Sequence, residues 1–331
     1  MQRTLTRRFV LFGLVAALAI PALAAQAASA KGTFERTLSV TGPVDLAVLT
    51  GAGHINVRAV EGNEVRIHGL VEARSNWLGK DGLDPEEKVR RIVANPPISQ
   101  TGNSIRIGQI EDKDLRENVS ISYEIEVPAD TRFKGETGSG HQTIEGLKRP
   151  VETSTGSGHL QISRIGSGVD AETGSGHIEL TDVKGDVRAE TGSGHITATG
   201  IAGNFRGNTG SGSVEAQLSV PAEAQIETGS GSVEVSGVRG GLRISTGSGS
   251  IEVEGEATKD WKLDTGSGGI SVRLPAEAAF ELDAHSDSGR VQTNHPVTVV
   301  GTVKPNALRG TVRGGGPRLS LETGSGTITI N

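Results

Sequence analysis

Residues 169–186 read VDAETGSGHIELTDVKGD and residues 187–204 read VRAETGSGHITATGIAGN, so two consecutive 18-residue segments carry one phrase at one place. The phrase Thr-Gly-Ser-Gly occurs nine times in the chain. Copies begin at Thr137, Thr155, Thr173, Thr191, Thr209, Thr228, Thr246, Thr265 and Thr323. The first eight follow one another at 18 or 19 residues, and the ninth comes 58 residues later. A fixed period of this length predicts a repeat architecture.

Apolar residues recur at the same positions of each copy and alternate with polar ones. One column holds Leu160, Ile178, Ile196, Val214, Val233, Ile251 and Ile270, and the column two residues on holds Ile162, Leu180, Ala198, Ala216, Val235, Val253 and Val272. Alternation with a period of two predicts two short strands per copy and excludes helix. Because two strands cannot bury an apolar face alone, the copies must stack into a continuous core.

The sequence therefore predicts an all-β fold, a right-handed β-helix-like solenoid with about 18 residues and two strands per coil. By parity the Thr of each phrase faces inward, where its hydroxyl can bond along the stack. The Gly-Ser-Gly corner is predicted to reverse the chain, because glycine adopts positive φ without a Cβ clash. The structural turn residues predicted on this basis are Gly138, Gly156, Gly174, Gly192, Gly210, Gly229, Gly247, Gly266 and Gly324.

Three regions follow from composition and pattern. Residues 1–30 resemble a secretory signal, with a basic start, an apolar stretch and a small-residue cleavage site at Ala25-Gln26-Ala27 or Ala28-Ser29-Ala30. Residues 31–130 form an irregular β region in which Thr50-Gly51-Ala52-Gly53-His54-Ile55 is a degenerate copy of the repeat, so the solenoid begins there. Residues 131–331 form the regular solenoid, and the ninth copy is expected to be its final coil.

One segment of the irregular region has a helical pattern instead. Asp84 supplies an N-cap, Pro85 the first helical position, and Val89, Ile92 and Val93 fall on one face before two prolines. A short helix is expected over residues 85–94. Its simplest role is to cover an open sheet edge or an end of the core, and docking of a partner is the alternative.

Composition limits the functional classes. The chain has no cysteine, so disulfides and thiolate chemistry are excluded. Its formal net charge of −6 argues against nucleic acid and anionic lipid as electrostatic partners. The apolar run near the N-terminus is too short for a confident membrane span, so no span is expected in the mature chain.

Four histidines occupy equivalent positions of consecutive copies and are the candidate metal ligands: His141, His159, His177 and His195. Stacked coils would place neighbouring imidazoles about 5 Å apart on an outward ladder. Such a ladder could share Zn²⁺ or Cu²⁺, with Glu172 and Glu190 as oxygen ligands. The alternative is that histidine recurs because the repeats were duplicated, since later copies carry serine or glycine there.

No catalytic constellation is found, and neither an enzymatic activity nor a cofactor is expected. Asp264-Thr265-Gly266-Ser267 matches an aspartic-protease phrase. That chemistry needs two carboxylates sharing one proton, and Asp287, the other aspartate in the series, stands in a different register. The match is interpreted as drift within the repeat.

The strand Tyr123-Glu124-Ile125-Glu126-Val127-Pro128 followed by repeated Thr-Gly-Ser-Gly-His/Ser-Ile/Val resembles the bacterial DUF4097 family of β-strand repeat proteins, related to candidate adhesins with a head GIN domain. The resemblance covers most of residues 40–331. It implies a solenoid at the cell envelope and supplies no catalytic residues to carry over.

Together these features favour an exported, non-catalytic envelope protein in the periplasm or at the cell surface. Its long outward faces suit an adhesin-like contact with a protein, peptide or polysaccharide surface. The first alternative, which the resemblance to the DUF4097 family implies, is a role in envelope stress or in the response to antimicrobial peptides. The second is a polysaccharide-processing enzyme, which would need acids converging in a groove.

Overall fold

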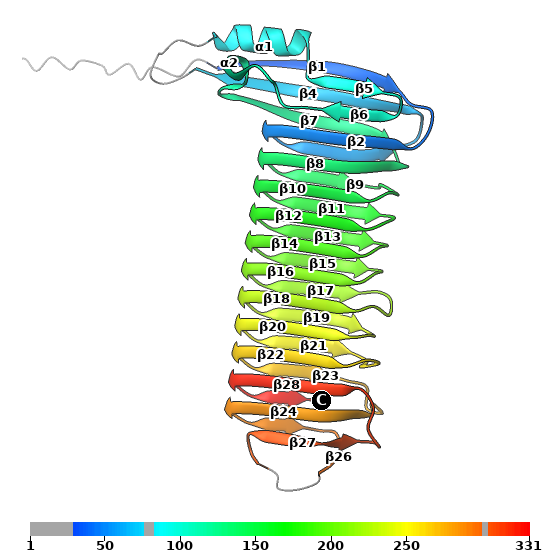
Figure 1. Cartoon of the computed structure of the whole chain (residues 1–331), viewed down its shortest axis with the longest axis vertical. Coiled ribbons are helices and arrows are strands. Elements are labelled where there is room, and N and C mark those ends of the chain that lie inside the picture. Colours follow the sequence, from blue (N-terminus) through cyan, green and yellow to red (C-terminus); the bar gives the residue numbers. More distant parts are fainter. Residues whose placement is uncertain (1–28, 76–82, 300–303) are drawn as a thin grey trace, which may run out of the picture.

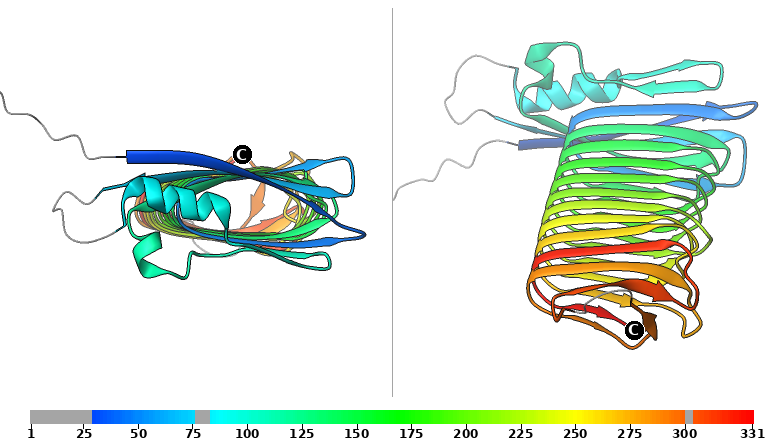
Figure 2. Two further views of the ribbon diagram at one scale, coloured as in Figure 1. Left: turned by 90° about the horizontal axis from the view of Figure 1, so that it is seen from above. Right: turned by 60° about the horizontal axis from the view of Figure 1, so that its bottom comes forward.

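The computed structural model describes residues 29–75, 83–299 and 304–331. The expected signal peptide lies outside these residues, apart from its last two positions. The described chain winds into a flattened tube of stacked coils, with one sheet on each broad side (Figures 1 and 2). The predicted β-solenoid is confirmed.

Each regular coil contributes one strand to each sheet. The strands that end in the Thr-Gly-Ser phrase are β8 (Thr131–Ser139), β10 (Val151–Ser157), β12 (Val169–Ser175), β14 (Val187–Ser193), β16 (Phe205–Ser211), β18 (Ala224–Ser230), β20 (Leu242–Ser248) and β22 (Trp261–Ser267). The strands of the opposite sheet are β9 (Gln142–Glu145), β11 (Leu160–Ile165), β13 (Ile178–Val183), β15 (Ile196–Ile201), β17 (Val214–Leu218), β19 (Val233–Val238), β21 (Ile251–Gly255) and β23 (Ile270–Arg273). Neighbouring strands within each set are parallel.

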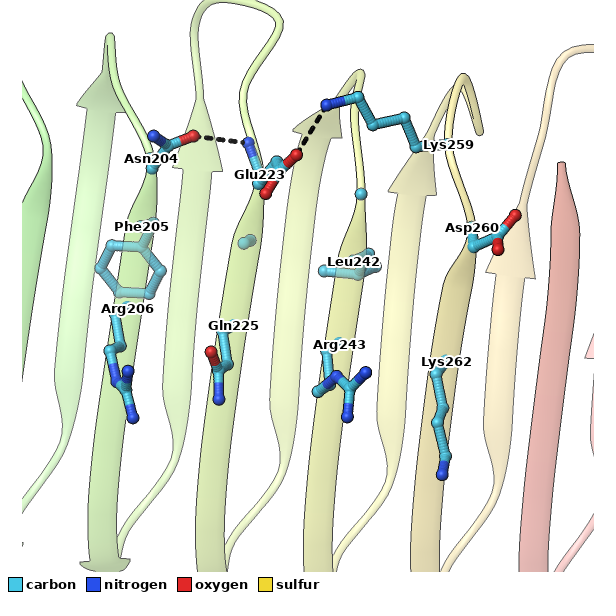
Figure 3. Close-up of a pocket in the computed structure, with 12 residues that line it drawn as sticks. Asn204, Phe205, Arg206, Glu223, Gln225, Leu242, Arg243, Lys259, Asp260 and Lys262 are labelled. Carbon is cyan, nitrogen blue, oxygen red and sulfur yellow. Dashed lines mark hydrogen bonds and ion pairs between the residues drawn. The ribbon is translucent and has the colours of Figure 1, made fainter.

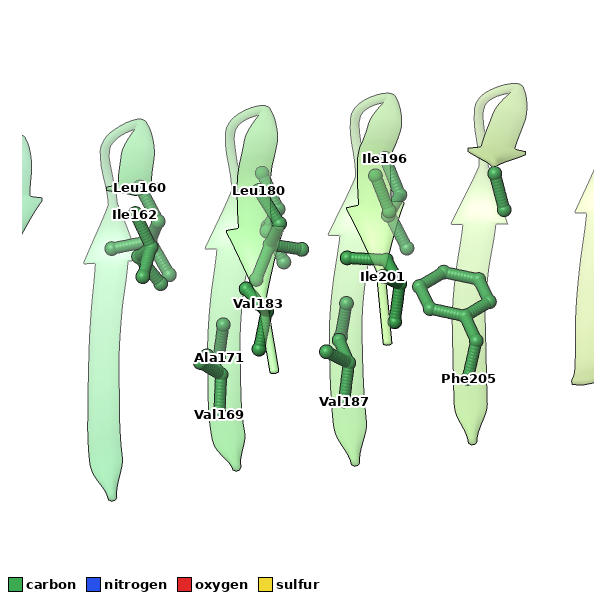
Figure 4. Packing of buried hydrophobic residues seen from close by; sticks show 14 of the residues in the cluster. Leu160, Ile162, Val169, Ala171, Leu180, Val183, Val187, Ile196, Ile201 and Phe205 are labelled. Carbon is green, nitrogen blue, oxygen red and sulfur yellow. The ribbon is translucent and has the colours of Figure 1, made fainter. Parts of the chain in front are cut away.

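The predicted apolar columns coincide with the register. Ile178 is paired with Ile196, and Ile196 with Val214, and each of the three is at most 1% exposed. All three belong to the hydrophobic core, and Figure 4 shows buried side chains of the two sheets, Ile196 and Val187 among them, packed between the layers. Equivalent apolar side chains therefore lie over one another in a dry interior, and their burial is the main favourable contribution to folding.

The threonines of the phrase are buried, as predicted, and bond along the stack through the backbone. The Thr173 hydroxyl donates to the carbonyl oxygen of Gly158 at 3.0 Å, and that of Thr191 donates to Gly176 at 3.0 Å. The same bond recurs in the other coils. Each buried hydroxyl thus links its coil to the one before.

The glycines of the phrase have a different physical reason from the one predicted. The first glycine of each phrase lies within a strand, and none of the nine has positive φ. A Cβ on Gly192 would lie 2.6 Å from the carbonyl oxygen of Gly174 in the previous coil. Close stacking of backbones therefore requires glycine there. Positive φ occurs at the second glycine of five copies, as at Gly268 with 149°, and at the opposite corner, where Arg164 has φ of 55°.

The N-terminal region contains a full coil built from β2 (Val44–Ala52) and β3 (Ile55–Val60), which stacks on β8 and β9. Thr50 pairs with Thr137, so the degenerate copy is a true coil. The sheets extend beyond it through β1 (Ser29–Ser39), β4 (Glu64–Arg74) and β7 (Val119–Pro128) on one side and through β5 (Ile98–Thr101) and β6 (Ser104–Ile107) on the other.

The expected helix is α1 (Pro85–Ala94), and Asp84 caps it by accepting from the backbone N–H of Glu86 at 3.1 Å. It lies across the end of the tube, next to the four-residue helix α2 (Lys113–Arg116) (Figure 2). Val89 and Ile92 are buried, and the Cγ1 of Val89 fills the space where a Cβ on Gly32 of β1 would lie. The helix thus covers the end of the core.

The C-terminal end corrects one expectation. The ninth copy forms β28 (Arg318–Ser325) and β29 (Ile328–Ile330), and β28 inserts between β22 and β24 (Phe280–Ser288) instead of ending the stack (Figure 1). In the opposite sheet β29 lies between β23 and β25 (Val291–Thr293). The sheet closes on the antiparallel strands β26 (Val297–Thr298) and β27 (Ala307–Val312). Inserted in this way, the last coil is paired on both sides, and the open edge is left to short strands.

Candidate functional site

Five histidines form a single stack on the corner that follows the phrase. They are His54, His141, His159, His177 and His195. Successive ring centroids are 4.8–5.2 Å apart, and the ring planes are within 11° of parallel. His54 is an addition to the four predicted. His54 belongs to the degenerate copy, but its distance in sequence from His141 does not fit the 18-residue period, so the period does not predict its place in the stack.

One hydrogen bond repeats along this histidine stack. The backbone N–H of His177 donates to Nδ1 of His159 at 2.9 Å, and the N–H of Ser213 ends the series by donating to Nδ1 of His195 at 3.0 Å. The other rings accept in the same way. Because each Nδ1 accepts, the ring proton of the neutral imidazole is on Nε2. Burial, followed by the neighbouring His159 and His54, lowers the pKa of His141.

This geometry bears on the metal prediction. Each Nδ1 is occupied by a backbone N–H, so Nε2 is the nitrogen left for a metal. One ion bound by two neighbouring rings at 2.0–2.1 Å would need converging nitrogens no more than about 4.2 Å apart. Parallel rings with centroids 4.8–5.0 Å apart do not supply this. No group of three or more metal-ligating side chains occurs in the described part of the chain. Metal binding at the stack stays a prediction.

The carboxylates named with those histidines have other surroundings. Glu190 on β14 forms an ion pair with Arg188, with 2.8 Å between the carboxylate Oε1 and a guanidinium nitrogen. This bond raises the pKa of the Arg188 guanidinium. Glu172 is exposed on β12, in register with Glu190.

The aspartic-protease phrase does not assemble a pair of aspartates. Asp264 is in register with Ser245 on one side and Glu322 on the other. Asp287 belongs to β24, which is separated from β22 by β28.

A second feature is a shallow depression of about 740 Å³ over β16, β18, β20 and β22 (Figure 3). One rim is built from the residues that precede these strands. There the backbone N–H of Glu223 donates to Oδ1 of Asn204 at 3.0 Å, and Nζ of Lys259 contacts the Glu223 carboxylate at 2.7 Å. Gly241 stands between Glu223 and Asp260 in this column and lines the depression.

The other rim is a row of outward side chains from four consecutive strands: Arg206, Gln225, Arg243 and Lys262 (Figure 3). Strand register pairs each with the next, so they follow one another along the tube axis. We call these four residues the basic row. The repeated phrase does not predict the basic row, because the row lies in a different outward column, whose residues change from coil to coil.

Residues 123–331 match the family model described as Toastrack DUF4097. The chain belongs to this family. The match begins at Tyr123 in β7, and it includes the four predicted histidines and the basic row. The resemblance drawn from the repeated phrase is thereby confirmed.

One solved structure similar to this Toastrack chain is a crystal structure of a candidate cell adhesion protein from Clostridium sporogenes ATCC 15579. The two chains are 13% identical, with a TM-score of 0.22, and the comparison covers 90% of this chain and 99% of the other. No curated protein matches the chain. Within the described residues, none of the helices has the length and apolar character needed to cross a membrane.

Proposed function

We propose that this Toastrack protein is exported to the cell envelope and acts there without catalysis, as an adhesin-like interaction surface. The observation that carries the proposal is the unbroken register of outward columns from β8 to β22. It presents the same side-chain positions once per coil, about every 4.8 Å. Weak contacts repeated along a rigid surface add up through multivalency.

The arrangement of the carboxylates supports a non-catalytic role. The phrase column contributes Glu136, Glu172, Glu190, Glu227, Asp264 and Glu322, which lie one above another along the axis. Glycosidases use two carboxylates that face each other across a substrate. A single column on one flat face favours contact with a surface over cleavage of a chain.

Export is the second part of the proposal and rests on the signal-like sequence of residues 1–30. The absence of cysteine from the chain suits an envelope protein that needs no oxidative folding. The decisive test of location is protease treatment of intact cells that produce this protein with an epitope tag at its C-terminus. We expect cleavage of the tagged protein in intact cells or after the outer envelope is opened, while a cytoplasmic marker is protected. A tag that stays protected in both states contradicts the proposal.

The interaction itself is tested by adherence. Beads coated with the chain from residue 28 onward are mixed with envelope fragments and with whole cells, and the bound fraction is counted. A matched control is the same chain unfolded by heat and coated at equal density. Retention well above the control is expected, and equal retention would argue against an adhesin-like role.

A further inference from the structure

The basic row carries three cations that have no carboxylate partner among the described residues. Arg206, Arg243 and Lys262 are exposed, and none makes an ion pair within that part of the chain. Gln225, between Arg206 and Arg243, donates through Nε2 to the Glu227 carboxylate at 2.9 Å. The row is thus three unpaired cations with one amide already engaged.

A neighbouring coil shows what pairing looks like at the same position. Arg188 is the register partner of Arg206, and Glu190, two residues further on β14, pairs with Arg188 at 2.8 Å. The residue equivalent to Glu190 is Asn208 beside Arg206 and Ser245 beside Arg243. The carboxylate column is therefore interrupted beside two cations of the row. A Glu at either position would stand beside its arginine as Glu190 stands beside Arg188.

Unpaired like charges on adjacent strands are unfavourable. Arg243 and Lys262, two cations without an ion pair in the described structure, are register partners on neighbouring strands. Like charges directly opposite each other destabilise a sheet, and the repulsion is relieved when an anion bridges them. Asp264, two residues after Lys262, is the remaining carboxylate in this part of the column and makes no ion pair in the described structure.

The surroundings of the row indicate what kind of anion fits. The row and its depression run along the tube axis over four coils, which suits an extended polymer with repeated negative charges. Phe205, the aromatic side chain at the depression, is 2% exposed, so no ring stands free beside the described row to stack on bases or on neutral sugars. Guanidinium groups bind carboxylates and sulfates through paired hydrogen bonds.

We propose that the basic row binds a linear acidic polysaccharide, with its carboxylate or sulfate groups on Arg206, Arg243 and Lys262. This inference rests on the proposed adhesin-like function and specifies the ligand class for one face. The polymer lies along the tube axis, over the depression between the row and the rim that contains Glu223. Ion pairs at one-coil spacing hold it there.

The test measures binding of immobilised polygalacturonate to the chain from residue 28 onward by biolayer interferometry. We expect binding that weakens as NaCl is raised to about 0.5 M, and no binding to dextran, which is neutral. Replacing Arg206, Arg243 and Lys262 together by Gln, the residue that the row already uses once, should weaken binding about tenfold or more. A control variant with Lys134→Gln, Arg188→Gln and Arg58→Gln loses the same charge from cations that are already paired, and should change affinity less than about twofold.

A second variant keeps the cations and restores the missing carboxylates, Asn208→Glu with Ser245→Glu. It should lose binding as strongly as the Gln variant, because Arg206 and Arg243 then pair within the chain as Arg188 does. Unchanged affinity in either variant overturns the inference. Equal affinity for polyglutamate or for oligo-dT also overturns it, because the row would then be a general polyanion site.

Failure of this inference is distinguishable from failure of the proposed function. If polygalacturonate does not bind while coated beads still adhere to envelope fragments, the ligand assignment is wrong and the adhesin-like role stands. If neither binds, the proposed function fails as well.

Discussion

The backbone N–H of His159 donates to Nδ1 of His141 at 2.9 Å, from one coil to the next across the outer corner. Protonation of that Nδ1 would remove the acceptor and place a positive charge about 5 Å from the next ring, where like charges repel by about 0.8 kcal/mol even in water. The histidine stack is therefore built for neutral imidazole.

The first prediction concerns pH. Burial lowers the pKa of His141 below its ordinary value of 6.5, so the unfolded chain takes up this proton more readily than the folded chain. The stabilising contribution is complete above pH 6.5 and is lost as the pH falls below it. We expect the free energy of unfolding in urea to decrease between pH 7.5 and pH 5, by about 1 kcal/mol for loss of the hydrogen bond that Nδ1 of His141 accepts.

The matched control replaces His141 by serine, the residue that later coils use at this position. That variant should lose less stability over the same pH range. If both proteins respond to acid equally, carboxylates elsewhere control the response and the stack is not the sensitive element.

The second prediction concerns close stacking at the phrase. A Cβ on Gly176 would clash with the carbonyl oxygen of Gly158, which is backbone and cannot move aside. Gly176→Ala should lower the free energy of unfolding by about 1–3 kcal/mol or more. Gly108→Ala is the control, since no atom lies within 4 Å of the added Cβ. Thermal unfolding followed by circular dichroism measures both, and equal melting temperatures would contradict the stacking argument.

The third prediction concerns the position of the last coil. Glu322 of β28 is in register with Asp264 on one side and with His285 on the other. Cysteines at Asp264 and Glu322 should form a disulfide on oxidation, because Cα atoms on adjacent strands are about 4.8 Å apart. Cysteines at Asp264 and His285 should not, because one strand separates them. The chain has no native cysteine, so mass spectrometry reads the result directly. If only the cysteines at Asp264 and His285 cross-link, β24 lies directly beside β22, as the order of the strands in the sequence would suggest, and the insertion of β28 is contradicted.

The fourth prediction concerns the mature N-terminus. Strand β1 begins at Ser29 and pairs with β4 from that residue onward. Cleavage after Ala27 keeps all of β1, whereas cleavage after Ala30 removes its first two residues. The exported protein should therefore begin at Ala28, as measured by the intact mass of protein recovered from the envelope. A protein that begins at Lys31 would show that the pairing of Ser29 and Ala30 with β4 is not needed.

Local periodicity determined the solenoid, because an alternating pattern repeated every 18 residues leaves one way to bury every apolar column. Ile178 over Ile196, the buried threonines and the corner position of four histidines all follow from it. The helix over residues 85–94 could also be predicted, since its cap and its prolines act locally.

What depended on contacts distant in sequence could be seen only in the folded chain. The insertion of β28 between β22 and β24, and the place of His54 at the head of the histidine stack, join segments separated by irregular stretches of chain. The basic row is a further case. In the sequence, Asn208 and Ser245 appear only as gaps in the carboxylate column, and the folded chain shows that they lie beside the cations Arg206 and Arg243. Sequence alone determined which side chains repeat. The tertiary structure decided which of these side chains are neighbours and which charges are left without a partner, because ion pairing depends on distances between atoms of different coils.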